Sequence, residues 1–282
     1  MTYPSMYLVT PTFRAATFII VFLPSEVKTK SEGKYVQVQL DERTNCNVWT
    51  RVFNPGVQDK YPLVMIHGMG AGLGLFAMNF DELSKCRTVY AIDLPGYARS
   101  SRCSFKSKPE EAEAQYVNSI ESWRIKVGLE KFCLLGHSFG GYLSAAYALK
   151  HPERISHLIL ADPWGLPEKP KDISRPIPIW IKILYHGLFK HLNPLAGLRL
   201  TGPWGAQTIG RMRPDLISKF QDIFDDEEEN KRVVSNYLYH SNVHTPSGES
   251  AFHSSKFNFI FLTFITAFSF YSSIIHYVSK FY

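Results

Sequence analysis

Four short and almost entirely apolar runs constrain the fold of this 282-residue chain more than any other feature. They are Pro62–Ile66, Thr88–Ile92, Phe132–Leu135 and His157–Ala161, and each is followed directly by His, Asp or Gly. Runs of this kind are typical of strands buried on both faces of a sheet. Helical patterns follow the second and third runs, at residues 109–126 and 139–150. Strands that alternate with helices predict an α/β fold with a parallel sheet.

Two more strands are predicted before these runs. Residues 35–40 alternate strictly between apolar and polar, and residues 48–53 favour a strand, which suggests an antiparallel pair. Residues 1–30 match no regular pattern and stay unassigned. Within them, the apolar stretch 15–23 is too short to span a bilayer, and no A-x-A-like cleavage site follows it. The core of the α/β domain is therefore assigned to residues 31–165.

Residues 166–250 interrupt the alternation and are interpreted as an inserted, mostly helical cap. Charge is segregated there, because residues 173–214 hold six Lys or Arg and no acid, whereas residues 215–229 hold seven Asp or Glu and one Lys. One helical face is apolar and consists of Trp180, Ile183, Leu184 and Leu188. Two interpretations of this face are left open: it packs on the α/β domain, or it contacts lipid.

The tail, residues 251–282, differs from the rest. Residues 257–279 contain no Lys, Arg, Asp or Glu, and Lys256 and Lys280 flank them. By length and charge this segment qualifies as a membrane-spanning candidate. It has only one Leu, however, so a non-native tail from an incomplete gene model fits equally well.

Composition and charge exclude several classes of protein. A hydrophobic fraction of 45% with 20% charged residues excludes a mainly disordered chain. The net charge of +6 suits an anionic surface such as phospholipid, and it is too diffuse to indicate nucleic acid. Four cysteines without CxxC spacing predict neither a disulfide framework nor a zinc site, and they favour a reducing compartment. No metal or cofactor is expected.

The segment from Gly136 to Gly140 reads G-H-S-F-G and contains the candidate catalytic residue. It follows an apolar strand and opens a helix, which is the context of a nucleophile elbow with Ser138 as nucleophile. Gly136 and Gly140 allow close backbone approach around His137 and Ser138. The helix N-terminus supplies N–H donors where an oxyanion would form, and the amide of Phe139 is the expected donor.

A second turn supports this interpretation. His67, Gly68, Met69 and Gly70 follow the first buried run, and the Met69 amide is the second expected oxyanion donor. His67 is interpreted as a structural hydrogen-bonding residue. Asp93 and Arg99 belong to a further tight turn and are expected to fix loops.

The partners that a serine nucleophile needs are not found. In the order Ser…Asp/Glu…His, an acid and a His should follow on later strands. Four histidines lie in or beside the cap or in the uncharged tail: His240, His244, His253 and His276. None has a suitable position, so we assign no triad acid and no triad His in this chain.

Many segments together strongly resemble the α/β-hydrolase-domain proteins 4 and 5, over residues 35–252. Among them are Leu63-Val-Met-Ile-His67-Gly, Arg99-Ser-Ser-Arg102, Gly136-His-Ser138, Asp162-Pro-Trp-Gly165, Asn193-Pro-Leu-Ala-Gly197 and Thr245-Pro-Ser-Gly-Glu249. The resemblance implies an α/β-hydrolase fold that acts in glycerophospholipid and neutral-lipid metabolism. The implied roles are hydrolysis of lysophospholipid or N-acyl phospholipid, acyl transfer to lysophosphatidic acid, and co-activation of a triglyceride lipase.

Three departures accompany the resemblance. Ala98 stands where the family's turn normally has Gly, and residues 1–30 lack the usual Trp-rich droplet anchor. The family's last strands, with the triad acid and His, are missing, and the Phe-rich tail replaces them. We therefore expect the strand that ends before Asp162 to be an exposed apolar edge, the product to be poorly soluble or membrane-associated, and ester hydrolysis to be residual.

Two functions of different classes remain. Retention of Ser138 favours a serine hydrolase or acyltransferase of lipids, whereas the missing triad partners favour a non-catalytic co-regulator of a lipase. Either would be cytoplasmic and peripheral on a lipid droplet, the endoplasmic reticulum or a mitochondrion. A protein anchored in the membrane by residues 257–279 is the third possibility.

Overall fold

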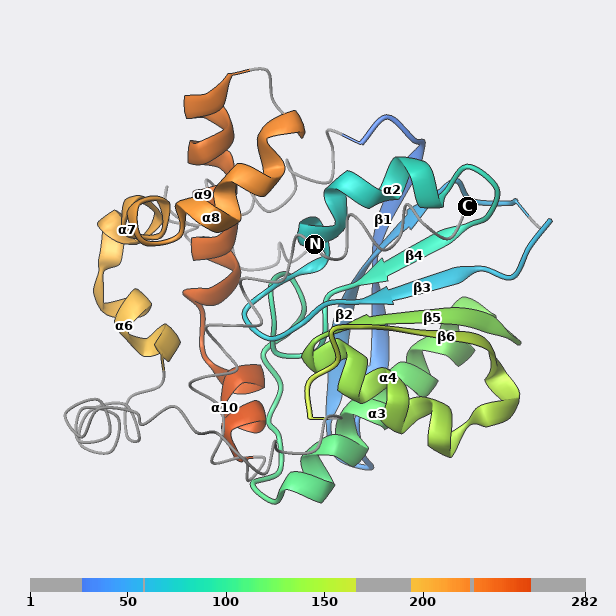
Figure 1. Ribbon diagram of the computed structural model, residues 1–282. Coiled ribbons are helices and arrows are strands. Elements are labelled where there is room, and N and C mark those ends of the chain that lie inside the picture. Colours follow the sequence, from blue (N-terminus) through green and yellow to red (C-terminus); the bar gives the residue numbers. More distant parts are fainter. Residues whose placement is uncertain (1–26, 58, 166–193, 224–225, 255–282) are drawn as a thin grey trace, which may run out of the picture.

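The computed structural model describes residues 27–57, 59–165, 194–223 and 226–254. Six strands form one mixed sheet in the order β1-β2-β4-β3-β5-β6 (Figure 1). The strands are β1 (Ser31–Gln39), β2 (Asn45–Phe53), β3 (Leu63–Ile66), β4 (Val89–Ile92), β5 (Phe132–His137) and β6 (Ile155–Ala161). β1 pairs antiparallel with β2, and β4, β3, β5 and β6 run parallel, so the predicted α/β fold is confirmed.

Helices cover both faces of the sheet. They are η1 (Leu73–Phe76), α2 (Ala77–Leu83), α3 (Pro109–Val127), α4 (Phe139–Lys150) and η2 (Pro152–Arg154). α2 lies on one face, and α3 and α4 lie on the other (Figure 1). α3 begins with Pro109 and two acidic residues and ends at Gly128 with a φ of 75°, as helix-terminus chemistry requires. The predicted helices at 109–126 and 139–150 match α3 and α4.

A second group of helices lies beside the sheet, toward the loop that follows β3 (Figure 1). It comprises α6 (Pro194–Leu200), η4 (Gly202–Trp204), α7 (Gly205–Met212), α8 (Pro214–Ile217), η5 (Ser218–Ile223), α9 (Glu227–Asn242) and α10 (Ser247–Ser254). Asp226 caps the N-terminus of α9, because its side chain accepts a hydrogen bond from the Glu229 amide. Phe220, Val234 and Leu238 pack with Leu75 in one apolar cluster. These helices occupy the described part of the predicted cap, and the predicted apolar face around Trp180 lies outside the described residues.

α10 crosses the boundary predicted between cap and tail at residue 250. Ala251 and Phe252 belong to the main core, and the Phe252 ring lies 4.9 Å from that of Phe139 and 4.8 Å from that of Trp164. The last turn of α10 therefore secures the cap against the elbow region. The segments 1–26 and 255–282 lie outside the described residues, including the predicted membrane candidate 257–279. None of the helices in the described ranges is long and apolar enough to cross a membrane.

β6 is an edge strand, and within the described ranges it pairs only with β5. Leu158 and Ile159 in its middle are 37% and 40% exposed. Because neighbouring residues of a strand point to opposite faces, both faces of the edge expose apolar surface. The predicted exposed, apolar, parallel edge is confirmed for this part of the chain.

The cysteine prediction is wrong at one pair. Cys46 and Cys103 form a disulfide with Cα atoms 6.0 Å apart, and Cys86 and Cys133 are free. The pair is 57 positions apart in sequence, so spacing gave no signal. It meets because the loop after β4 runs beside the start of β2, where the Ser101 amide donates to the Asn47 carbonyl at 2.9 Å. With this disulfide, the cysteines no longer favour a reducing compartment.

Candidate active site

Ser138 occupies the sharp turn between β5 and α4. Its backbone has φ 52° and ψ −117°, a conformation that few residues other than Gly adopt. Three backbone hydrogen bonds hold it, because the Ser138 amide donates to the Ala161 carbonyl at 3.1 Å and its carbonyl accepts from the Tyr142 and Trp164 amides. The side chain is half-buried. This is the geometry of a nucleophile elbow, in which a strained turn lifts the hydroxyl clear of the sheet.

The two glycines of the motif are required by close packing. A Cβ at Gly136 would lie 2.3 Å from the Gly140 carbonyl oxygen and from Ser144 Oγ. A Cβ at Gly140 would lie 2.4 Å from the Ile66 carbonyl oxygen. The first turn of α4 thus rests directly on the end of β3, which brings the elbow against the loop that follows β3.

That loop carries the second expected oxyanion donor. Gly68 lies against the elbow so closely that a Cβ there would be 3.0 Å from Ser138 Cβ. Met69 follows and is buried, and Gly70 has a φ of 69° that turns the chain away. Phe139 is the first residue of α4, so its N–H is one of the helix donors without an intrahelical acceptor. The Met69 and Phe139 amides therefore belong to the two segments that flank Ser138.

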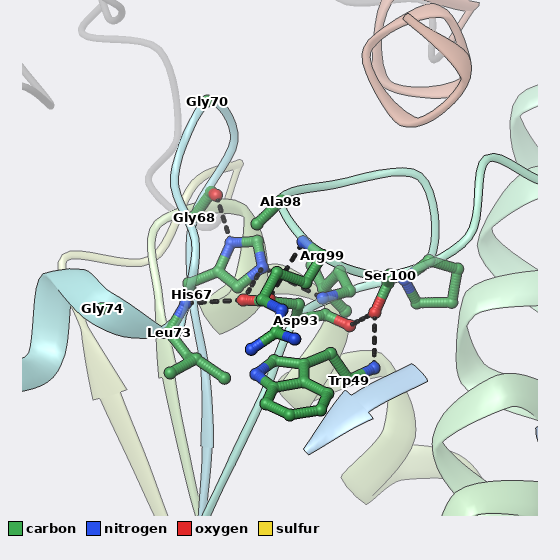
Figure 2. Close-up of polar contacts among 12 residues, drawn as sticks. Trp49, His67, Gly68, Gly70, Leu73, Gly74, Asp93, Ala98, Arg99 and Ser100 are labelled. Atoms are coloured by element: carbon green, nitrogen blue, oxygen red, sulfur yellow. Dashed lines mark hydrogen bonds and ion pairs between the residues drawn. The ribbon is translucent and has the colours of Figure 1, made fainter. Parts of the chain in front are cut away.

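His67 is fully buried and supports this loop (Figure 2). Its Nδ1 lies 2.7 Å from the Gly68 carbonyl oxygen, which can only accept, and its Nε2 accepts from the Leu94 amide at 3.0 Å. Burial lowers the pKa of His67 to about 4, so the ring is neutral with its proton on Nδ1. Both ring nitrogens are occupied by backbone groups, which leaves His67 no part as a base for Ser138.

Asp93 joins its own turn to the segment at Leu73, beneath the loop that follows β3 (Figure 2). Its Oδ1 accepts from the Leu73 amide at 2.7 Å, and its Oδ2 accepts from the Arg99 amide at 3.1 Å. Burial raises the pKa of Asp93 to about 6. The Arg99 guanidinium stacks over the Trp49 ring at 3.5 Å, outside this pair of hydrogen bonds.

The cap fixes the same loop from the other side. Tyr237 Oη accepts from the Gly74 amide at 2.8 Å, and Asn242 Nδ2 donates to the Gly70 carbonyl at 2.7 Å. Neither residue was singled out from the sequence. They are 163 and 172 positions from their partners, and only the packing of α9 reveals them.

No base for Ser138 is found in the described ranges. Ser138 Oγ has no hydrogen-bond partner there, and His137, its neighbour, is buried with its pKa lowered to about 3 by burial and by His67. His240 lies in the last turn of α9, and His244 follows the end of that helix. In the same ranges no group of His, Cys, Asp or Glu could hold a metal ion.

Comparison with known proteins agrees with this geometry. Residues 61–194 match the sequence model of the alpha/beta hydrolase fold family. The naproxen esterase and the carboxylesterase CesB of Bacillus subtilis have TM-scores of 0.53 and 0.55 at 17% and 19% identity. They cover 86% and 83% of this chain and 72% and 71% of their own. At these identities the likeness concerns the fold alone. The described residues thus form an α/β-hydrolase domain.

Within that class the chain is homologous to two kinds of curated protein. The 1-acylglycerol-3-phosphate O-acyltransferase ABHD5 of Mus musculus is 52% identical over 207 residues, which are 73% of this chain and 57% of that protein. The (lyso)-N-acylphosphatidylethanolamine lipase of Homo sapiens is 46% identical over 223 residues, 78% of this chain and 64% of that protein. The chain therefore spans less than two thirds of the length of these relatives.

Proposed function

We propose that this protein is a serine hydrolase or acyltransferase of glycerophospholipid and neutral-lipid metabolism, with Ser138 as nucleophile. The strained elbow at Ser138, packed against Gly68 of the loop after β3, is the observation that carries the proposal. A relative at 52% identity is named an acyltransferase for 1-acylglycerol 3-phosphate, and one at 46% is named a (lyso)-N-acylphosphatidylethanolamine lipase. Both names describe acyl groups on glycerophospholipids, which is the substrate class we propose.

In the proposed reaction Ser138 Oγ attacks the acyl carbonyl carbon and loses its proton to a base. The carbonyl oxygen becomes an oxyanion that the Met69 and Phe139 amides stabilise. Collapse of this intermediate breaks the ester bond, returns the proton to the leaving alcohol, and leaves an acyl-serine. Attack by water completes hydrolysis, whereas attack by a lysophospholipid hydroxyl completes acyl transfer. The base and the carboxylate that orients it are not assigned to any residue of this chain.

A fluorophosphonate probe tests the nucleophile, because attack on phosphorus requires an activated serine. We expect the protein isolated from its own cells to carry the adduct on Ser138, and Ser138→Ala to abolish it. Ser104→Ala is the matched control, since Ser104 is exposed on a loop and lies outside the proposed site. An adduct that survives Ser138→Ala would contradict the proposal.

A non-catalytic co-regulator of a triglyceride lipase at a lipid-droplet or membrane surface is the second candidate. It is favoured by one observation, that Ser138 Oγ has no hydrogen-bond partner within the described ranges. This function predicts that a triglyceride lipase is stimulated equally by the wild type and by Ser138→Ala, with no fluorophosphonate adduct on either. Loss of the stimulation in Ser138→Ala would exclude it.

A further inference from the structure

The outer side of the cap exposes large apolar side chains. Leu200 ends α6, Trp204 ends η4 and Met212 ends α7, and these side chains are 85%, 69% and 73% exposed. α6 and α7 lie on the side of α9 that is turned away from the sheet (Figure 1). Single exposed apolar residues are common on proteins, whereas several from one short stretch of chain indicate a binding surface. We call Leu200, Trp204 and Met212, together with Arg211, the rim patch.

The opposite side of α7 rests closely on α9. A Cβ at Gly205 would lie 1.9 Å from Tyr239 Cε2, and Tyr239 Oη donates to the Gly202 carbonyl at 2.6 Å. A Cβ at Gly210 would lie 3.2 Å from Ser235 Oγ. This close approach leaves no room between the two helices for the large apolar side chains of the rim patch, which therefore stay outside.

The exposed residues around α7 share one face. At 3.6 residues per turn, Trp204, Gln207, Arg211 and Met212 fall within one half of the helix, and all four are exposed. Trp is enriched at the boundary between lipid and water, because its ring is apolar and its N–H is polar. Arg can extend its charged end to the headgroups while its apolar stem stays in the lipid. Such a face is typical of a helix that lies in the interface of a lipid surface.

The charge of this segment favours an anionic surface. Residues 194–214 contain three arginines and no Asp or Glu. Arg211 is exposed, and no carboxylate of the described residues pairs with it. The acidic run at residues 226–229 begins α9, whereas α6 is held at the opposite end of that helix, where Arg199 Nε donates to the His244 carbonyl at 3.1 Å. Arginines near an anionic lipid surface are attracted to its headgroups.

We propose that the rim patch docks on an anionic phospholipid surface. Leu200, Trp204 and Met212 insert below the headgroups, and Arg211 lies at the level of the phosphates. The inference rests on the proposed function, because acyl groups of glycerophospholipids are presented at such a surface, and it names the part of the protein that binds there.

α9 connects the rim patch with the candidate active site. One side of this helix contacts α7 through Ser235 and Tyr239. The other side holds the loop after β3, because Tyr237 Oη accepts from the Gly74 amide and Asn242 donates to the Gly70 carbonyl. One helix therefore separates the docked surface from the loop that carries an expected oxyanion donor.

Binding is measured by flotation of the full chain with vesicles, in the Ser138→Ala background so that turnover does not enter the measurement. The vesicles contain phosphatidylcholine alone or with an equal part of phosphatidylserine. We expect Leu200→Ser and Trp204→Ser each to weaken binding at least about fivefold. Leu149→Ser is the matched control and should leave binding unchanged, because Leu149 is 86% exposed on α4, outside the cap. Equal losses in all three variants would contradict the proposal.

Charge reversal tests the anionic component. Arg211→Glu should weaken binding to the phosphatidylserine vesicles at least about fivefold and change binding to pure phosphatidylcholine little. Arg43→Glu alters the net charge equally, on an exposed loop between β1 and β2, and should have little effect. If both reversals weaken binding equally, the net charge and not the rim patch attracts the protein, and the assignment of Arg211 is wrong.

Fluorescence quenching measures contact directly, whichever other segment of the chain also binds lipid. Subtraction of the emission of Trp204→Phe from that of the wild type isolates the signal of Trp204. When the vesicles carry bromine on their acyl chains, we expect this signal to lose at least about half its intensity, because an inserted indole lies within reach of the bromine. An unchanged Trp204 signal in vesicle-bound protein would overturn the proposal.

Other occupants of the rim patch give different results. If a second copy of the chain covers it, Leu200→Ser should dissociate an oligomer in sedimentation while vesicle binding stays unchanged, which would contradict the proposal. If another segment of the same chain covers it, Trp204 should be shielded both from acrylamide in the free protein and from brominated lipid, which would also contradict it. Fluorophosphonate labelling of Ser138 does not depend on these results, so failure of the docking surface is distinguishable from failure of the proposed function.

Discussion

His67 Nε2 and Asp93 Oδ1 lie 4.0 Å apart in the fully buried base of the candidate site, yet they are not hydrogen-bonded to each other. Each is committed to backbone instead, His67 to Gly68 and Leu94, and Asp93 to Leu73 and Arg99. The pair thus resembles a catalytic His–Asp couple in its composition, but it holds the loop after β3 in place. Its two members respond to pH in opposite directions.

The pH dependence of stability follows from their pKa values. His67 titrates at about 4 when folded and near 6.5 when unfolded, so its contribution is present above pH 6.5 and is lost as the pH falls toward 4. Asp93 titrates at about 6 when folded and near 3.8 when unfolded, so its contribution is present below pH 3.8 and is lost as the pH rises through 6. In the wild type the two dependences offset each other.

Single substitutions should reveal how His67 and Asp93 each contribute to the pH dependence of stability. In Asp93→Asn we expect the free energy of unfolding to fall more steeply than in the wild type between pH 6.5 and 4, by up to about 1.4 kcal/mol per pH unit. In His67→Asn it should fall as the pH rises from 4 to 6. Urea titrations at several pH values measure both. Parallel pH profiles for the wild type and the two variants would show that neither group titrates as described.

Ala98 has a φ of 40° in a buried turn. A left-handed conformation costs an alanine about 1–2 kcal/mol, and glycine adopts it freely at a smaller entropic cost. We therefore expect Ala98→Gly to leave the melting temperature unchanged or raise it. Ala148→Gly, inside α4, is the matched control and should lower stability by about 1 kcal/mol. Equal losses in both variants would mean that Ala98 is not strained.

The Cys46–Cys103 disulfide closes a stretch of chain that contains β3, the loop that follows it and Asp93. With a separation of 57 residues, chain-entropy arguments give the bond about 4 kcal/mol of stability. We expect a reducing agent to lower the melting temperature of the wild type and of Cys86→Ser by the same amount, and to have no effect on Cys46→Ser. Four free thiols in the denatured, unreduced protein would contradict the pairing.

The exposed edge of β6 should drive self-association, because unpaired parallel strand edges with apolar side chains recruit other strands. We expect Leu158→Lys to reduce light scattering of the concentrated protein with little change in melting temperature. Leu149→Lys is the control, since Leu149 is 86% exposed on α4, away from the edge. If both substitutions reduce scattering equally, general hydrophobicity and not the strand edge is responsible.

Much of the fold follows from local patterns in the sequence. The apolar runs specify β3 to β6, and Pro109, Gly128 and the elbow motif place the ends of α3 and α4. What could not be predicted depends on contacts between distant segments. The Cys46–Cys103 bond arises only when the turn after β4 packs beside β2, and the Asn242 contact with Gly70 only when α9 packs on the loop after β3.

We propose above that Ser138 is a nucleophile presented to acyl groups of lipids. The most direct measurement is fluorophosphonate labelling of the endogenous protein, with intact mass and peptide mapping on the same sample. We expect one adduct, on Ser138. An unlabelled Ser138, in an extract whose other serine hydrolases are labelled, would contradict it and would favour the regulatory function.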